Sequence, residues 1–215
     1  MRPIKKHCIF DLDGTLFDSM TNWPRAMIRI LDEAGLKYPD DVVNIMTPLG
    51  YKGCAEYFIS LGHPEKNPDV IMEKMYDYLT EDYANSILIK PYVKEMLESL
   101  KNVGIRIYAL SASPHKMIDA CLKRNGVYDL FDAVWSTDDF GLIKSDPKIY
   151  KTAADWMGAG IDEIEFYDDN ITALQTAKSV GFRVIGVYDP TTENYRAEIK
   201  SFADGYVSSF SEMLE

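Results

Sequence analysis

The stretch Ile9–Ser19, which reads IFDLDGTLFDS, constrains the fold of this chain more than any other feature. A short apolar run leads into it and predicts a buried strand, which ends where Asp11 and Asp13 flank a single leucine. Gly14 then permits a tight turn that a side chain would obstruct. Two carboxylates this close repel each other unless a cation or a shared proton lies between them. A lone Asp-x-Asp is more often the solvent-exposed end of a strand than a binding or catalytic site. The residues elsewhere in the chain therefore determine which of these two interpretations is favoured.

Strand and helix patterns alternate over most of the chain. Apolar runs predict strands at His7–Phe10, Ile105–Leu110, Ala133–Trp135, Ile164–Tyr167, Phe182–Val187 and, more weakly, Gly205–Val207. Apolar residues at helical spacing predict helices at Pro91–Val103, His115–Asn125, Pro147–Met157 and Thr172–Val180. Such alternation indicates an α/β fold with a doubly wound, mostly parallel sheet and helices on both faces. In these sheets ligands bind beyond the carboxyl ends of the strands, where Asp11 and Asp13 fall.

One interval, from about Met20 to Ser86, interrupts this alternation. It has helical periodicity and no convincing strand, and Gly and Pro residues divide it into about four helices. We therefore predict an α/β core made of residues 1–19 and 87–215, with residues 20–86 inserted as a helical cap. A helical domain that begins directly after Ser19 would act as a lid over the carboxyl ends of the strands.

Composition narrows the class of protein. With 215 residues the chain can bury a core as one large domain plus a modest second one. The formal net charge of −11 argues against a nucleic-acid partner, because such a surface would be basic. No apolar run is long enough to span a bilayer, so we expect no membrane partner. Cys8, Cys54 and Cys121 are widely spaced, which favours buried free thiols and a reducing cytoplasm. We expect a monomer or a homodimer.

A hydroxyl group follows the second predicted strand. The segment Tyr108–Ser113 reads YALSAS, and the Ser111 hydroxyl together with backbone N–H groups of the next residues, Ala112 among them, can hold phosphate oxygens. As an isolated signal, Ser111 would more often cap the following helix. Ser113, immediately before Pro114, is the better candidate for a simple N-cap.

A lysine and two acids complete the set of candidate site residues. Lys144 precedes the helix predicted from Pro147 and would supply a compact positive charge, although most lysines are solvated surface residues. Asp168 and Asp169 end the fourth predicted strand and are followed by Asn170. Asp-Asp-Asn is also good turn chemistry, so this signal is weak when taken alone.

In their order along the chain, these four stretches resemble the four motifs of the haloacid dehalogenase superfamily. With the helical insertion, the chain resembles the phosphoglycolate phosphatase and β-phosphoglucomutase branch. The resemblance implies a Rossmann-like sheet with the first strand central, in the order 3-2-1-4-5, and an inserted helical cap. Two positions depart from the family pattern: Ser145 replaces the usual first proline of the third motif, and Ala173 stands where the family has a further acid.

The resemblance also implies a magnesium-dependent phosphatase for a small phosphorylated metabolite. Asp11 would attack phosphorus and form an aspartyl-phosphate, and Asp13 would protonate the leaving oxygen and then accept a proton from water. Lys144, Ser111 and Ala112 would bind the phosphoryl group and neutralise its charge. Because the overall charge repels a phosphate, these local groups would have to attract it.

The metal site implied by the resemblance consists of oxygen ligands. Mg²⁺ would be held by Asp11, by the backbone carbonyl of Asp13 and by Asp169, and hard oxygen ligands of this kind suit that ion. Asp168 is the candidate for an additional ligand, because the family's later acid is missing here.

Three alternatives remain beside the phosphatase. Dehalogenases of the superfamily lack the second acid, so Asp13 argues against that chemistry. A phosphomutase of the β-phosphoglucomutase type would need an arginine in the cap, and residues 47–53 contain none, although Lys52 could act as a weaker substitute. Tyr51 and Lys52 are therefore the predicted substrate contacts of the cap. A non-catalytic phosphate-binding protein is less compatible with the complete set of acids and lysine.

Overall fold

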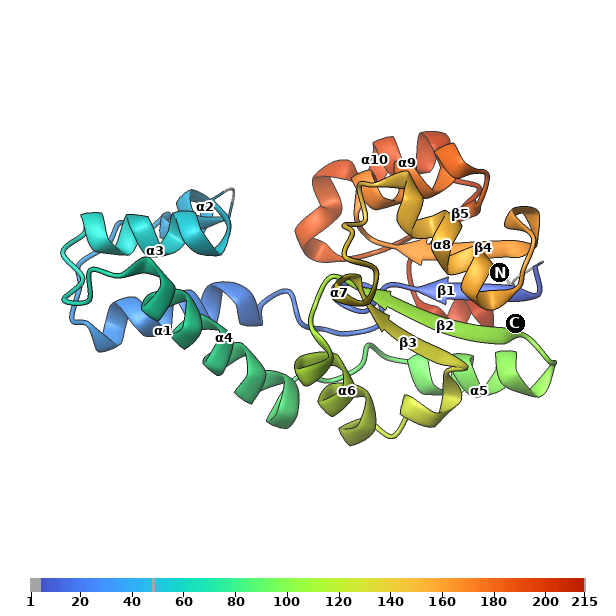
Figure 1. The fold of residues 1–215 in the computed structure, drawn as a ribbon, viewed down its shortest axis with the longest axis horizontal. Coiled ribbons are helices and arrows are strands. Elements are labelled where there is room, and N and C mark those ends of the chain that lie inside the picture. Colours follow the sequence, from blue (N-terminus) through green and yellow to red (C-terminus); the bar gives the residue numbers. More distant parts are fainter. Residues whose placement is uncertain (1–4, 48, 215) are drawn as a thin grey trace. The chain divides into compact units, whose positions relative to one another are not determined.

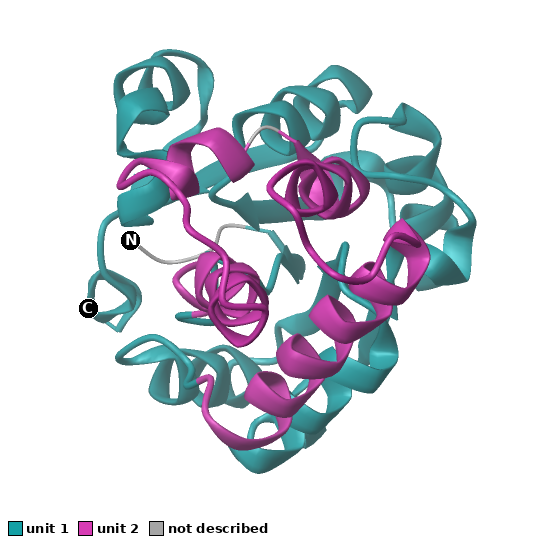
Figure 2. Cartoon of the chain, turned by 90° about the vertical axis from the view of Figure 1, so that its left-hand side faces the viewer, with its two compact units in different colours: residues 1–18, 88–215 teal, residues 19–87 magenta. Residues whose placement is uncertain are grey.

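The computed structural model describes residues 5–47 and 49–214, and the chain folds into two compact units (Figure 1). Unit 1 comprises the chain up to Asp18 and from Leu88 onward, and unit 2 comprises Ser19–Ile87 (Figure 2). Each unit has its own secondary structure and its own buried residues, and each is described separately below.

Unit 1 is built on one six-stranded sheet in which all neighbouring strands are parallel. The strands are β1 (His7–Phe10), β2 (Arg106–Ser111), β3 (Ala133–Ser136), β4 (Ile164–Asp168), β5 (Arg183–Val187) and β6 (Gly205–Val207). Their order is β3-β2-β1-β4-β5-β6, so the predicted order 3-2-1-4-5 is confirmed, and the weakly predicted last strand joins the sheet beside β5.

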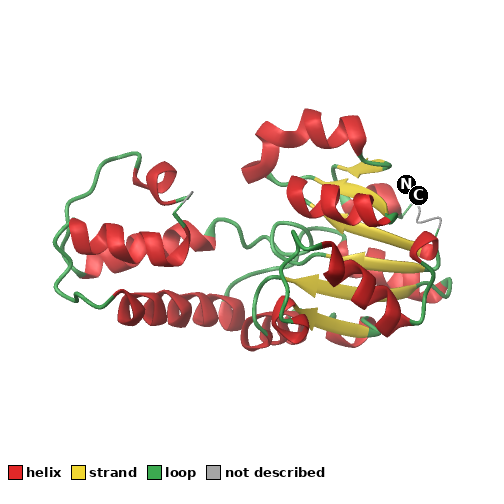
Figure 3. Cartoon of the chain, turned by 45° about the horizontal axis from the view of Figure 1, so that its top comes forward, coloured by secondary structure: helices red, strands yellow, loops and turns green. Residues whose placement is uncertain are grey.

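Helices cover both faces of this sheet, as the crossover connections require (Figure 3). The helices of unit 1 are α5 (Val93–Asn102), α6 (His115–Arg124), α7 (Thr137–Phe140), α8 (Pro147–Met157), α9 (Ile171–Val180) and α10 (Arg196–Phe202). Four short 3₁₀ helices are η1 (Tyr128–Leu130), η2 (Ile161–Glu163), η3 (Pro190–Tyr195) and η4 (Phe210–Met213). Helices α5 and α6 lie on one face, and α8, α9 and α10 lie on the other (Figure 1).

The central residues of the strands are largely apolar because the helices bury them from both sides. All five residues of β4 are buried. On the α8–α10 face, Ile9 and Phe166 from the sheet pack in one apolar cluster with Tyr150, Leu174 and Ile199 from the helices. This two-sided core fixes the positions of the strand ends, where the polar residues lie.

Unit 2 is the predicted helical insert, and it consists of α1 (Asn22–Glu33), α2 (Val42–Met46), α3 (Gly50–Ser60) and α4 (Pro68–Asn85). It has a separate apolar core, to which Met27, Ile30, Phe58 and Met75 contribute. These side chains therefore serve to pack the helices of unit 2 together. Within the described part of the chain, no helix combines the length and the apolar character needed to cross a bilayer.

The start of α5 differs from the prediction. The sequence suggested a helix that opens at Pro91, but the helix begins at Val93 because Tyr92 adopts the left-handed conformation, with φ of 67°. Among the described residues other than glycine, Tyr92 alone has a positive φ. A side chain in this region is strained, because Cβ approaches the following carbonyl oxygen.

Replacing Tyr92 with glycine should therefore stabilise the protein. The strain costs about 1 kcal/mol or somewhat more, and part of its relief is lost to the greater freedom of glycine in the unfolded chain. Thermal unfolding should show a higher midpoint for Tyr92→Gly. Tyr195, which is equally exposed (50% against 49%) but has an ordinary φ of −96°, is the matched control. Tyr195→Gly should give no gain, and an equal gain at both positions would contradict the strain argument.

Candidate active site

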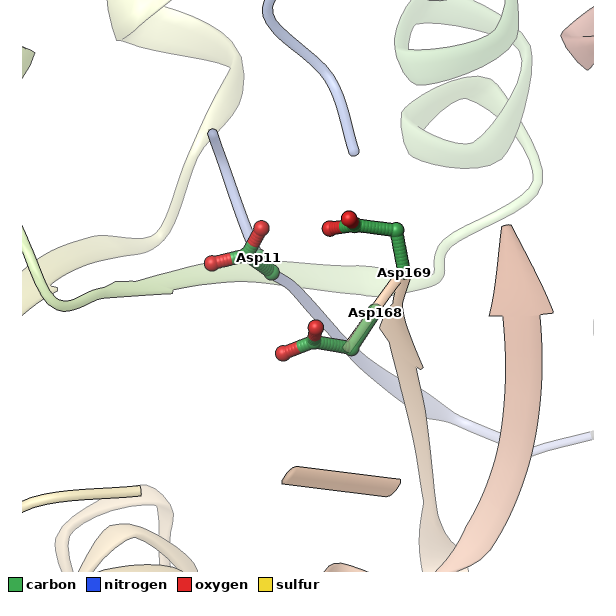
Figure 4. Close-up of side chains that lie close together, drawn as sticks. All are labelled: Asp11, Asp168 and Asp169. Atoms are coloured by element: carbon green, nitrogen blue, oxygen red, sulfur yellow. The ribbon is translucent and has the colours of Figure 1, made fainter. Parts of the chain in front are cut away.

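The register of the sheet brings two acids side by side. Phe10 of β1 pairs with Tyr167 of β4, so the next residues, Asp11 and Asp168, are neighbours at the carboxyl edge. The Asp11 backbone N–H donates to the Tyr167 carbonyl at 2.8 Å, which continues the pairing to the strand end. Asp169 follows, and the three buried acids each place a carboxylate oxygen within 4.8 Å of the others (Figure 4).

Lys144 reaches this cluster from the loop before α8. Its ammonium group donates to Oδ1 of Asp11 and to Oδ2 of Asp168, the second at 3.0 Å. The Lys144 backbone carbonyl accepts a hydrogen bond from the Tyr150 hydroxyl at 2.9 Å, so α8 holds the lysine loop. The structure thus unites three of the predicted acids with the predicted lysine at one place.

Burial and mutual repulsion dominate the electrostatics of the cluster. Burial raises the pKa of Asp11 to about 7; the Lys144 ammonium opposes this rise, and the Asp168 and Asp13 carboxylates add to it. Burial, Asp168 and Asp11 likewise raise the pKa of Asp169 well above its ordinary value. Burial lowers the pKa of Lys144, but Asp11 and Asp168 outweigh that effect and the net pKa is raised. The lysine therefore stays charged among acids that repel one another.

The turn at Gly14 fixes the third acid. Gly14 has a φ of +82°, and a Cβ at this position would lie 2.8 Å from Oδ2 of Asp169, so glycine is required on both counts. The Thr15 hydroxyl donates to Oδ1 of Asp169 at 3.1 Å and accepts from the Asp169 backbone N–H at 3.1 Å. These contacts explain why Gly-Thr follows the two acids in the opening stretch.

Asp13 is held by two serines at the end of β2. Its Oδ2 accepts from the Ser113 hydroxyl at 2.7 Å and from the Ser111 hydroxyl at 3.3 Å. The prediction that Ser113 caps the following helix is wrong: the N-cap of α6 is Pro114, and the Ser113 side chain turns to Asp13 instead. Ser113 is thus a site residue that sequence reasoning missed. Ala112, between the two serines, is exposed.

Both oxygens of Asp168 are engaged. Oδ2 accepts from Lys144, and Oδ1 accepts from the backbone N–H of Asn170 at 2.7 Å. Asn170 in turn caps α9, since its side-chain oxygen accepts from the N–H groups of Thr172 and Ala173 at 2.9 and 3.1 Å. The start of α9 therefore fixes the direction in which Asp168 points.

The predicted substrate contacts Tyr51 and Lys52 lie on α3 of unit 2. The Tyr51 ring packs between the rings of Trp23 and Tyr76 in tilted geometry, with centroid distances of 5.1 and 4.6 Å. The Lys52 side chain is exposed. Residue 48 of the predicted contact loop lies outside the described residues.

The donor set of the cluster fits a divalent metal ion. Three buried carboxylates offer hard oxygen ligands, and one oxygen atom of each lies within 4.8 Å of the others. A cation bound between the acids would remove the repulsion that Lys144 balances in part.

His115, two residues after Ser113, links two helices of unit 1. Its Nδ1 lies 3.0 Å from Oδ1 of Asp119 on α6, and its Nε2 lies 2.8 Å from Oδ2 of Asp139 on α7. Burial acts to lower the pKa of His115, but the two carboxylates outweigh it and the net pKa is raised. The ring therefore joins the segment after Ser113 to the helix that precedes the Lys144 loop.

This link should make stability depend on pH in a defined direction. Because the folded pKa of His115 lies above the unfolded value of 6.5, its contribution is fully present below that value and is lost as pH rises through the folded pKa. Thermal melting of wild type and His115→Gln should differ most near pH 6 and least near pH 9.

His7 provides a control of opposite sign, because burial lowers its pKa. Its protonation opposes folding, so His7→Gln should gain stability relative to wild type as pH falls below 6.5. Parallel pH profiles for the two variants would contradict both assignments.

Comparison with known proteins places this arrangement in context. The family model of haloacid dehalogenase-like hydrolases matches residues 5–181. A provisionally named phosphatase of Bacillus subtilis, YhcW, is 26% identical over 209 residues, which cover 93% of each chain. Hexitol phosphatase B of Escherichia coli is 24% identical and covers 95% of this chain and 92% of its own. The crystal structure of a provisionally named β-phosphoglucomutase of Thermotoga maritima has the same fold, with a TM-score of 0.85, 20% identity and coverage of 97% and 96%.

Proposed function

The chain belongs to the haloacid dehalogenase-like hydrolase family, and we propose that it is a phosphatase that cleaves a small phosphomonoester through an aspartyl-phosphate on Asp11. One observation carries this proposal: Asp11 directly follows β1 and lies beside the Lys144 ammonium, whereas Asp13, two residues on, accepts hydrogen bonds from two hydroxyl groups. The two acids thus stand in different environments, as a nucleophile and a proton-transfer group require. The names of the curated relatives support a phosphatase.

In the first half of the reaction, a carboxylate oxygen of Asp11 forms a bond to phosphorus while the bond from phosphorus to the ester oxygen breaks. Lys144 favours the ionised form of the Asp11 carboxylate and offsets the negative charge of the approaching phosphoryl oxygens. The Ser111 hydroxyl turns from its long 3.3 Å bond with Asp13 to those oxygens, together with the N–H groups near Ala112, and the Ser113 hydroxyl keeps its bond to Asp13. Asp13 donates its proton to the departing oxygen, which leaves as an alcohol.

In the second half, Asp13 takes a proton from a water molecule whose oxygen attacks phosphorus. The bond between phosphorus and Asp11 breaks, inorganic phosphate leaves, and the carboxylate of Asp11 is restored. Asp13 regains the proton that it lost in the first half, so protons and bonds balance over the cycle.

We propose Mg²⁺ as the metal ion, held by Asp11, the backbone carbonyl of Asp13 and Asp169. When bound, the ion supplies positive charge beside the transferring phosphoryl group. Asp168 stays a candidate for an additional ligand, and its hydrogen bonds with Lys144 and Asn170 also assign it a part in orienting the lysine.

The substrate we propose is a phosphorylated sugar or sugar alcohol, because a curated relative that matches almost the whole chain is a hexitol phosphatase. Phosphoglycolate and nucleoside monophosphates belong in the same assay, since the cap would select among them. Tyr51 and Lys52 are the cap residues that we propose as substrate contacts. All three cysteines are buried thiols, which agrees with the reducing cytoplasm that we propose as the compartment.

Replacing Asp11 with asparagine should abolish turnover and leave the fold intact, because the amide is not a nucleophile. We expect the Mg²⁺-dependent release of phosphate from an aryl phosphate to fall by roughly 10³-fold or more. Asp155, an exposed acid of α8, provides the matched control, and Asp155→Asn should retain full activity. Undiminished turnover by folded Asp11→Asn would reject the nucleophile assignment.

The β-phosphoglucomutase fold neighbour makes a mutase the second candidate. With β-glucose 1-phosphate as substrate, we expect ³¹P NMR to show inorganic phosphate and no glucose 6-phosphate. The expectation rests on residues 47–53, which contain no arginine, and Lys52 would be only a weaker substitute. Accumulation of glucose 6-phosphate would establish the mutase instead.

A further inference from the structure

A second buried ion pair lies beside the Gly14 turn and takes no part in the chemistry described above. Lys90, in the segment where the chain re-enters unit 1, pairs with Oδ2 of Asp189 at 3.0 Å. We propose that Lys90 is a positioning residue: by holding the Gly14 carbonyl, it fixes the turn that presents Asp13 and Asp169 to the metal ion. This inference rests on the proposed metal site of the phosphatase.

The Lys90 ammonium makes three contacts. It donates hydrogen bonds to the Gly14 carbonyl and to the Tyr188 carbonyl, the second at 2.8 Å, and it forms an ion pair with the Asp189 carboxylate. The side chains of Lys90 and Asp189 are 14% and 2% exposed. A lysine committed in this way cannot turn to a substrate phosphate without breaking three buried interactions, so its role is to hold the backbone.

The Gly14 turn needs such a restraint. Glycine has more backbone freedom than any other residue type, so the Gly14 turn is not held by its own side chain. No other residue can replace Gly14 here, because a Cβ would contact the Asp169 carboxylate. Because peptide units are planar, fixing the Gly14 carbonyl also fixes the plane that carries the Thr15 N–H. Thr15 holds Asp169 through two hydrogen bonds of 3.1 Å. Lys90 therefore acts on Asp169 through Gly14 and Thr15.

Both ends of this restraint are themselves anchored. The Lys90 backbone N–H donates to the Leu16 carbonyl at 2.8 Å, next to the turn that its side chain holds. Asp189 follows β5, and its Oδ1 accepts from the backbone N–H and the hydroxyl of Thr191 at 2.9 and 2.6 Å. The ammonium is thus held between the segment that follows β5 and the nucleophile loop.

The ion pair permits a test in which net charge stays constant. Lys90→Met alone would leave the Asp189 carboxylate buried and unpaired near Asp169, which would change the charge at the metal site as well as the geometry. The double variant Lys90→Met/Asp189→Asn removes one positive and one negative charge, and asparagine can still cap η3. Asp189→Asn alone retains the bonds from Lys90 to the Gly14 and Tyr188 carbonyls.

The experiment is calorimetric titration of each folded protein with Mg²⁺ alone, in the absence of substrate. We expect Lys90→Met/Asp189→Asn to bind Mg²⁺ about 10-fold more weakly than wild type, and Asp189→Asn to remain within about 2-fold. Arg183→Met/Glu165→Gln, which removes another buried pair of unit 1 (3.0 Å), controls for general loss of stability and should bind as wild type does.

Wild-type Mg²⁺ affinity in the folded double variant would overturn the proposal. So would an equal loss in Asp189→Asn or in the control pair, because the effect would then not pass through Gly14. If the double variant does not fold, Lys90→Arg takes its place. The planar guanidinium keeps the ion pair with Asp189 but does not reproduce the bonds of the compact ammonium to both carbonyls, so we expect weaker Mg²⁺ binding. Unchanged Mg²⁺ binding in Lys90→Arg would reject the positioning role. Absence of Mg²⁺ binding in wild type would identify the metal site of the proposed function as the failed premise, and the role of Lys90 would fall with it.

Discussion

Mutual repulsion among buried carboxylates is the constraint on which the rest of this structure depends. Asp11 and Asp168 reach the same edge because β1 and β4 pair in register, and Asp169 follows within the same 4.8 Å cluster. Each acid is held by a specific donor: Lys144 bonds Asp11 and Asp168, and Thr15 bonds Asp169. The donors come from the α8 loop and from the Gly14 turn. The parallel sheet therefore collects charge at one edge, and the loops decide how that charge is used.

Much of the fold could be predicted because parallel strands buried on both faces are apolar along their length, which gave all six strands to within a residue or so at each end. What failed was local. Helices α7 and α10 are too short, at four and seven residues, to show helical periodicity. The prediction placed the start of α5 two residues early, because nothing in the sequence indicates that Tyr92 adopts the left-handed conformation.

The residues that follow the predicted strands indicated the location of the site, because the carboxyl ends of parallel strands meet at the same edge of the sheet. Asp11, Asp168, Asp169 and Lys144 come together as that rule requires. Ser113 and Lys90 were missed because neither is the residue that directly follows a predicted strand, and their bonds to Asp13 and Tyr188 join positions 100 and 98 residues apart. The spacing of residues along the chain does not indicate such contacts, and a serine before a proline predicts a helix cap.

The central claim is that Asp11 forms a covalent bond to phosphorus, and trapping that bond tests it most directly. Turnover quenched in acid and then treated with borohydride reduces an aspartyl-phosphate to homoserine, which peptide mass spectrometry locates. We predict homoserine in place of Asp11 when Mg²⁺ and a turning-over phosphomonoester are present, and an unmodified Asp11 when the ester is omitted. Modification at Asp13 or at Asp168, with Asp11 unchanged, would contradict the account.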